Sequence, residues 1–255
     1  MNVDKILSLI CTAGVIMLEN GAEIYRVEDT TSRLCASYGL TNIDSYAMPS
    51  IIFLNVFYDN KNYSAMRRVK LSHFNLQKVI EINKLSRSIT DKHLSIEELE
   101  ERINHIENNN NLIKYKSLIF SALGACFYTL MFKGSFSDAM VSFFIGLLLR
   151  SFQIIFASKI NYFMGYFFSS ALISFLAVLS FLFVPRVNYN VVIIGSLVLL
   201  LPGMQITNSI RDTLTGDFSS GLSRATQAIV IAVSIAVGTG FTLTLFIGIL
   251  ERGIL

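Results

Sequence analysis

The chain has 255 residues, of which 53% are hydrophobic and 15% are charged, whereas soluble domains contain roughly 25% charged residues. This composition excludes an ordinary soluble domain. The net charge is +3, and the basic residues of the apolar second half are scattered singly, without a patch that could track a phosphate backbone, so nucleic-acid binding is excluded too.

Charged side chains are concentrated in the first part of the chain. Residues 1–116 contain 28 of the 39 Lys, Arg, Asp and Glu residues, and residues 117–255 contain the other 11. The predicted fold class is therefore an α-helical membrane protein with an N-terminal cytoplasmic α+β domain. We place this domain at residues 1–111 and the transmembrane domain at residues 112–255, with the polar run Asn108–Asn111 as the linker.

Two amphipathic helices are predicted at the N-terminus. Apolar residues at positions 3, 6, 7, 10, 14 and 17 follow one helix face, and a second such pattern runs from Ile24 to Tyr38 after the break at Asn20-Gly21. The first stretch has about the length of a signal-peptide core, but Asp4 lies beside its single lysine and no small-residue cleavage site follows. We therefore expect it to remain a helix of the domain.

The next segment changes to the alternation that is typical of β-strands. Strands are predicted near Ile43–Met48, Ile51–Tyr58 and Tyr63–Lys70, with turn residues at Asp59–Asn62 between the last two. Helical spacing returns over Leu76–Ile89 and again from Ser95, where Ser-Ile-Glu-Glu is a capping box.

The cysteines and histidines show no metal-binding pattern. Cys11, Cys35 and Cys126 form no Cys-x-x-Cys pair, and none of the three histidines has the spacing of zinc ligands. We expect no metal and no cofactor, and we interpret the cysteines as small buried side chains in a reducing compartment.

The second half contains charge-free stretches that predict about five membrane-spanning helices, each near the ~20 residues that a bilayer requires. They lie at approximately 117–132, 139–158, 160–185, 187–210 and 225–250. Without an export signal the N-terminus should be cytoplasmic, and the odd number of spans places the C-terminus on the other side. In the last span Ala228, Ala232, Ala236 and Gly240 recur every four residues and predict a close-packed stripe.

Arg150 lies near the middle of the second predicted span, where an unpaired charge costs about 2.5 to 3.5 kcal/mol. Asp138, Ser142 and Gly146 share its helix face, so this face should meet other helices or water. Two interpretations stay open: a structural pair with a carboxylate of another helix, or a role in binding the substrate.

The fourth predicted span is interrupted by Leu201-Pro202-Gly203. A broken helix can present free N–H groups and a partial positive charge to an anion. We predict that substrate is bound by the residues around and after this break together with Arg150, namely Pro202, Gly203, Gln205, Asn208, Arg211, Asp212 and Asp217. The alternative is that Pro202 merely marks a helix end at the membrane interface.

A second cluster of charges, Glu19–Arg33, lies in the N-terminal domain. Its members Glu23, Arg26 and Glu28 are most simply a solvated helix face. No nucleophile, histidine partner or metal ligand accompanies them, so no catalytic residue is predicted. A membrane-anchored enzyme or regulator that acts through this cluster is the alternative function.

Three separated motifs, in this order, resemble the threonine/serine exporter (ThrE-like) family, and more closely its stand-alone N-terminal half, the YjjP type. They are the run Glu19-Asn20-Gly21-Ala22-Glu23-Ile24-Tyr25-Arg26-Val27-Glu28, the step Ala47-Met48-Pro49-Ser50, and the residues Leu201-Pro202-Gly203, Asn208, Arg211-Asp212, Gly216-Asp217, Gly221-Leu222 and Arg224. The resemblance covers nearly the whole chain.

The resemblance implies an inner-membrane exporter of small carboxylates: amino acids such as threonine and serine for full-length members, and succinate for the split YjjP–YjjB type. It also implies a separate, smaller membrane partner of the YjjB type; a higher oligomer is a further option. We therefore predict a transporter subunit in which Arg150, Arg211 and the half-helix after Gly203 hold the substrate carboxylate. Asp212, Asp217 or Asp138 would then serve an ammonium group or a proton.

Overall fold

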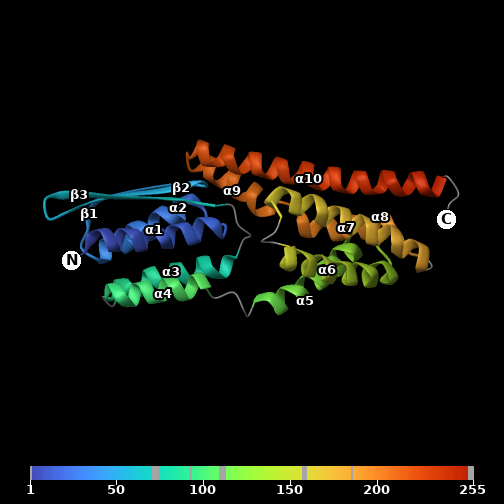
Figure 1. Cartoon of the computed structure of the whole chain (residues 1–255), viewed down its shortest axis with the longest axis horizontal. Helices are drawn as coiled ribbons and strands as arrows, with labels where there is room; N and C mark the ends of the chain where they lie inside the picture. The colour runs from blue at the N-terminus through green and yellow to red at the C-terminus, as the bar shows by residue number, and fades with distance from the viewer. Residues whose placement is uncertain are drawn as a thin grey trace. The chain divides into compact units, whose positions relative to one another are not determined.

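The computed structural model describes residues 2–70, 75–91, 94–108, 113–156, 160–184 and 186–251 (Figure 1). The chain forms two compact units. The first unit consists of Met1–Asn110 with Met204–Thr226, and the second of Asn111–Gly203 with Gln227–Leu255. The segment Met204–Thr226 thus packs with the N-terminal residues, although the sequence pattern assigns it to the transmembrane domain. Residues 109–111 of the predicted linker and the last four residues of the chain lie outside the described part.

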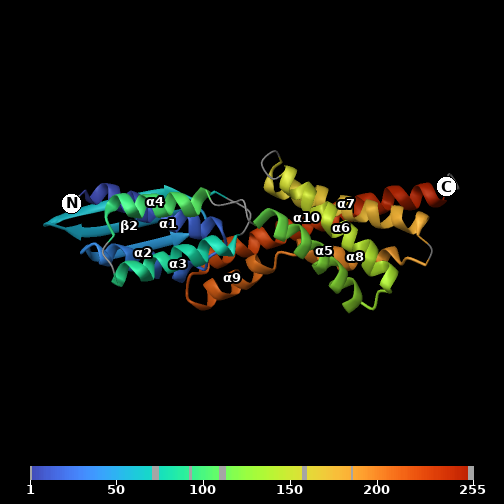
Figure 2. The ribbon, with the colours of Figure 1, turned by 90° about the horizontal axis from the view of Figure 1, so that it is seen from below.

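Helices cover one face of a small sheet in the first unit. The helices α1 (Val3–Glu19) and α2 (Ile24–Ser37) pack on the antiparallel strands β1 (Thr41–Met48), β2 (Ile51–Tyr58) and β3 (Lys61–Arg68), which pair in that order. Figure 2 shows the helices in front of the sheet. Ile52, Leu54 and Val56 of β2 are buried, because alternate residues of a strand face the helices.

The β2–β3 turn is tighter than predicted. Tyr58 pairs with Lys61, so Asp59 and Asn60 alone form the turn, each with a positive φ. Two-residue turns of this conformation match the twist of the flanking strands. The prediction of a four-residue turn was wrong because it counted every polar residue between the two apolar runs.

The helices α3 (Leu76–Asp91) and α4 (Ile96–Asn108) complete the core against α1 and α2. The predicted capping box is confirmed, since Ser95 N donates to Glu98 Oε2 at 3.1 Å and Glu98 N donates to Ser95 Oγ at 3.2 Å. Cys11 and Cys35 are buried in this core, and burial raises the pKa of the Cys11 thiol to about 11. The interpretation of the cysteines as buried side chains is confirmed for these two, whereas Cys126 is half-buried.

The second unit contains α5 (Ile113–Met131), α6 (Phe136–Phe156), α7 (Tyr162–Phe183) and α8 (Tyr189–Leu197), which ends in a 3₁₀ turn (Val198–Leu200). The helix α9 (Gly203–Leu214) follows in the chain and belongs to the first unit. The helix α10 (Phe218–Glu251) begins earlier than predicted, and its residues from Gln227 onward belong to the second unit. Only α6, α7 and Phe218–Phe246 of α10 are, among the described helices, individually long and apolar enough to cross a membrane.

A fourth span exists if α8 and α9, which are bent by 48° at their break, count as one. The apolar part of α5, Lys116–Met131, is shorter than these candidate spans. The predicted count of about five spans is therefore not confirmed, since charge-free runs record composition and not where a helix ends.

The small-residue stripe predicted for α10 does not follow the buried face of this helix. Of its four members Ala228 is buried, as predicted, but Ala232, Ala236 and Gly240 are exposed, whereas Gly238 is buried. A Cβ atom on Gly238 would collide with the backbone carbonyl of Phe167 in α7, so the close approach lies at Gly238.

Candidate functional site

The loop between α1 and α2 meets α9 and the start of α10 within the first unit (Figure 1). Asn208 Nδ2 donates to the Gly21 carbonyl at 3.0 Å, and Arg224 Nη2 donates to the Ala22 carbonyl at 2.8 Å. Gly21 has a φ of 92°, a conformation that favours glycine at the end of α1. We call the group Glu23, Asn208, Arg211, Asp212 and Arg224 the polar junction.

A buried ion pair lies at the centre of the polar junction. Asp212 Oδ2 is 2.9 Å from Arg224 Nε, and the two side chains are 1% and 5% exposed. This contact lacks the alignment of a hydrogen bond, whereas the guanidinium makes its hydrogen bond to Ala22. Charges removed from water to this extent are stable only when paired, so Asp212 and Arg224 depend on each other.

The Asp212 carboxylate also caps a helix that lies far away in the sequence. Asp212 Oδ1 accepts a hydrogen bond from Ile24 N, the first residue of α2, at 3.4 Å. The N-cap residue of α2, Glu23, makes no capping bond with its own side chain. Asp212 therefore takes that role, and the negative charge is favourable at a helix N-terminus.

Glu23 instead links two arginines. Its Oε1 pairs with Arg211 of α9, and its Oε2 lies 3.2 Å from Arg26 Nη2. The Arg211 side chain is 46% exposed and the Glu23 side chain is 13% exposed, so this pair is partly accessible while the Asp212–Arg224 pair is buried. The structure thus brings the predicted N-terminal cluster and the residues after the predicted break into one site.

Asp217 and Glu28, two further predicted site residues, have structural partners next to the polar junction. Asp217 Oδ1 accepts from Ser220 N at 3.3 Å and caps α10, and Glu28 Oε1 accepts from Ala47 N at 2.9 Å and ties α2 to β1. Burial raises the pKa of the Glu28 carboxyl, and the nearby Asp217 and Asp212 carboxylates raise it further, against the lowering effect of the Ala47 N–H.

The predicted break before α9 is confirmed. The helix stops at Leu201-Pro202, and the axis turns by 48° before α9 continues. Gly203 N already donates to the Leu201 carbonyl at 2.8 Å, so this N–H group is not free. Gln205 is buried. A substrate-binding role of Pro202, Gly203 and Gln205 stays a prediction.

Arg150 belongs to the second unit. Its Nε donates to Ser117 Oγ of α5 at 2.8 Å, and its Nη1 donates to Gln153 Oε1 at 3.1 Å. It forms no ion pair with a carboxylate among the described residues, so the pair that one interpretation expected is not seen. A guanidinium held by a hydroxyl and an amide keeps its full positive charge, and its role in substrate binding stays a prediction.

Asp138, the alternative group for a proton or an ammonium, is used by the fold. Its Oδ2 accepts from the backbone and side chain of Ser135, and its Oδ1 accepts from Asn188 N at 2.7 Å. Asp138 therefore caps α6 and holds the residue before α8.

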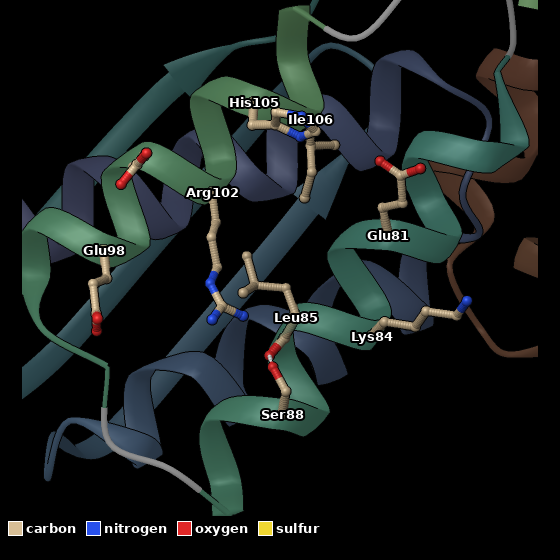
Figure 3. Close-up of a pocket in the computed structure, with 9 residues that line it drawn as sticks. Glu81, Lys84, Leu85, Ser88, Glu98, Arg102, His105 and Ile106 are labelled. Carbon is tan, nitrogen blue, oxygen red and sulfur yellow. Dashed lines mark hydrogen bonds between the residues drawn. The ribbon is translucent and has the colours of Figure 1, made fainter. Parts of the chain in front are cut away.

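A groove of about 630 Å³ lies between α3 and α4 in the first unit (Figure 3). Arg102 extends across it toward Leu85 and Ser88 of α3. Its charged lining residues have both signs: Glu81, Lys84, Glu98, Glu101 and Arg102. Within the described residues no group of His, Cys, Asp and Glu side chains could hold a metal ion. The groove offers no buried charged group, so the polar junction is the stronger candidate site.

Two parts of the polar junction were missed by the residue-by-residue prediction of the site. Arg224 appears only among the residues of the resemblance, although an arginine directly before the charge-free stretch 225–250 is a signal in itself. The carbonyls of Gly21 and Ala22 carry no side-chain signal, so no sequence pattern could have identified them.

The sequence of the chain is similar to those of a known protein family. The model of the threonine/serine exporter family, ThrE, matches residues 8–246. A protein of Escherichia coli (strain K12) named "Probable succinate transporter subunit YjjP" is 23% identical over 239 residues, which cover 91% of each chain. A protein of the same name from Klebsiella aerogenes is 22% identical, over 96% of this chain and 98% of its own.

No solved structure matches the chain. The family consists of transporters and not of enzymes, and its function agrees with the apolar helices of a membrane protein. The match spans the α1–α2 loop, the break and α10 together, so this chain belongs to the threonine/serine exporter family.

Proposed function

We propose that this chain is one subunit of an exporter of small carboxylates, either succinate-like dicarboxylates or threonine and serine. It works with a smaller, YjjB-type membrane subunit in the inner membrane, with its N-terminal residues in the cytoplasm. The family match and the name of the two relatives, which are called succinate transporter subunits, support this proposal.

The observation that carries the proposed site is the Glu23–Arg211 pair. Arg211 is half-exposed and already binds a carboxylate, that of Glu23. A substrate carboxylate has the same charge and shape, and a guanidinium binds either with two parallel hydrogen bonds. The substrate would therefore replace Glu23 at Arg211, while the buried Asp212–Arg224 pair keeps the segment in place.

Transport by the purified protein tests this function. The chain should be reconstituted in liposomes with and without its YjjB-type partner, and the release of labelled succinate, threonine and serine should be followed. We expect release of at least one of these when both subunits are present. The proposal fails if none is released by the pair, or if the chain alone hydrolyses a substrate instead.

We expect Arg150 to act through its charge. Arg150→Met removes the guanidinium at similar length, and a hydrogen bond between charged groups contributes about 1.5–3 kcal/mol, so substrate affinity should fall roughly 10- to 100-fold. Arg150→Lys keeps the charge but loses the planar fork and should also transport poorly. Transport rates at varied substrate concentration measure both effects.

Ser117→Ala is the matched control, because it removes the hydroxyl that accepts from Arg150 Nε and leaves the charge. It should transport nearly normally. If Arg150→Met transports as well as Ser117→Ala, then Arg150 is only a structural residue.

A further inference from the structure

The helix α9 buries its polar face in the first unit. Asn208, Ser209 and Asp212 are buried there, and each has a named partner. Asn208 bonds to the Gly21 carbonyl, Ser209 Oγ donates to the Gly221 carbonyl at 2.7 Å, and Asp212 pairs with Arg224. An amphipathic helix of a soluble domain does the opposite, because it buries its apolar face.

The face of α9 opposite to these residues carries large apolar side chains, and further exposed apolar side chains lie in the first turns of α10, after the turn at residues 215–217. Exposure runs from 48% at Ile206 to 81% at Leu214, and within each helix the members are four residues apart. We call this row the apolar ridge: Ile206, Ile210, Leu214, Phe218 and Leu222. Apolar surface of this extent on a domain in water marks a contact with another apolar phase.

The segments before and after α9 indicate that this apolar phase is the lipid bilayer. Phe218–Phe246, which begins within the ridge, is itself a candidate membrane span, and the apolar α8 precedes α9. The 12 residues of α9 give a length of about 18 Å, which is too short to cross a hydrocarbon core of ~30 Å. The other face of α9 contacts the Gly21 carbonyl of the α1–α2 loop and the Ile24 N–H of α2, so lipid cannot surround it.

We propose that the apolar ridge lies in the lipid headgroup region of the bilayer, so that α9 is an interfacial helix that attaches the N-terminal part of the first unit to the membrane surface. Helices with one apolar and one polar face lie in this plane. Here the polar face binds the protein's own α1–α2 loop through the polar junction. Arg211 follows Ile210 of the ridge, and its side chain is 46% exposed, so it can contact the headgroups or water while it pairs with Glu23.

This arrangement places the α1–α2 loop close to the membrane surface, whatever the substrate is. It also leaves α8 with its 3₁₀ turn, Tyr189–Leu200, as the only part of the bent pair that enters the hydrocarbon core.

Fluorescence can locate the ridge, because the chain contains no tryptophan. Leu214→Trp places a single reporter at its most exposed position, and Ile210→Trp is a second reporter in case the first variant fails to fold. Met66→Trp is the matched control, since Met66 is 65% exposed on β3 of the same unit. Each full-length variant is reconstituted in phospholipid vesicles with bromine placed on the acyl chains either near the carbonyls or near the chain ends.

We expect both ridge reporters to lose most of their fluorescence to shallow bromine, less to deep bromine and little to aqueous iodide. Met66→Trp should be quenched by iodide and not by bromine. Iodide quenching of the ridge reporters equal to that of Met66→Trp would overturn the proposal, as the ridge would then face water. Stronger quenching by deep bromine would place α9 inside the hydrocarbon core, and protection from both quenchers would mean that protein covers the ridge; either result also overturns the proposal.

Discussion

Replacing Arg224 by methionine should lower the free energy of unfolding by about 3–5 kcal/mol, because it leaves the Asp212 carboxylate buried without its counter-charge. The Ala22 carbonyl loses its donor at the same time. The native thiols of Cys11 and Cys35, which are buried in the core of the first unit, report unfolding through their reaction with a fluorescent maleimide. In a Cys126→Ala background, the unfolding temperature should fall by roughly 10 °C or more.

Two variants make this result specific. Arg26→Met removes an exposed arginine that also pairs with a carboxylate, that of Glu23, and such pairs contribute only about 0–1 kcal/mol. Adding Asp212→Leu to Arg224→Met removes both charges and should recover part of the lost stability. If Arg224→Met and Arg26→Met unfold at the same temperature, then the buried pair does not hold α9 and α10 to the α1–α2 loop.

The sequence predicted the elements of the first unit well because each has a local signal. The helices α1 and α2 follow a 3.6-residue apolar period and are separated by Asn20-Gly21, and the capping box at Ser95 starts α4. Exact turn length was not predictable from composition, since the positive φ of Asp59 and Asn60 depends on the pairing of the two strands.

The polar junction could not be predicted, because its hydrogen bonds to the α1–α2 loop join residues 187 to 202 positions apart. A periodic pattern identifies the polar face of α9 but not its partner. For this reason Glu23 and Arg211 belonged to two alternative functions in the sequence analysis, a charged surface cluster and a substrate site. The structure shows them as one ion pair.

Likewise, apolar composition predicted the long apolar helices α6, α7 and α10 but not which face of each helix is covered. The buried glycine of α10 is Gly238, and the predicted stripe through Ala232 and Ala236 is exposed. Spacing alone marks several close-packing faces on one helix, and only the neighbouring helix selects among them.

Substitutions of Glu23 and of Arg211 should change the affinity for substrate in opposite directions. Arg211→Gln removes the guanidinium that we propose as the carboxylate site, so the affinity for succinate or threonine should fall roughly 10- to 100-fold, as expected for the loss of a charge-assisted hydrogen bond. Glu23→Gln removes the competing carboxylate but keeps the shape of the side chain. The Arg211 member of the pair is half-exposed, and such a pair contributes about 0.2–1 kcal/mol, so its loss should raise substrate affinity by up to about fivefold. Transport by the reconstituted pair of subunits, at varied substrate concentration, measures both changes.

Exchanging the charges of Glu23 and Arg211 distinguishes a role in substrate binding from a purely structural role of the pair. Glu23→Arg with Arg211→Glu keeps an ion pair between α9 and the α1–α2 loop. The Arg26 side chain is 41% exposed, so it can turn toward water and away from the new positive charge. If the pair only holds the two segments together, the exchanged protein should transport nearly as well as the parent. If Arg211 binds the substrate, the exchanged protein should still fold, as judged by the reaction of its buried thiols. It should nevertheless bind carboxylate as poorly as Arg211→Gln. A carboxylate at position 211 repels the substrate, and the new arginine at position 23 lies on the other side of the pair. We expect the second result, and normal transport by the exchanged protein would move the carboxylate site away from the polar junction and toward Arg150.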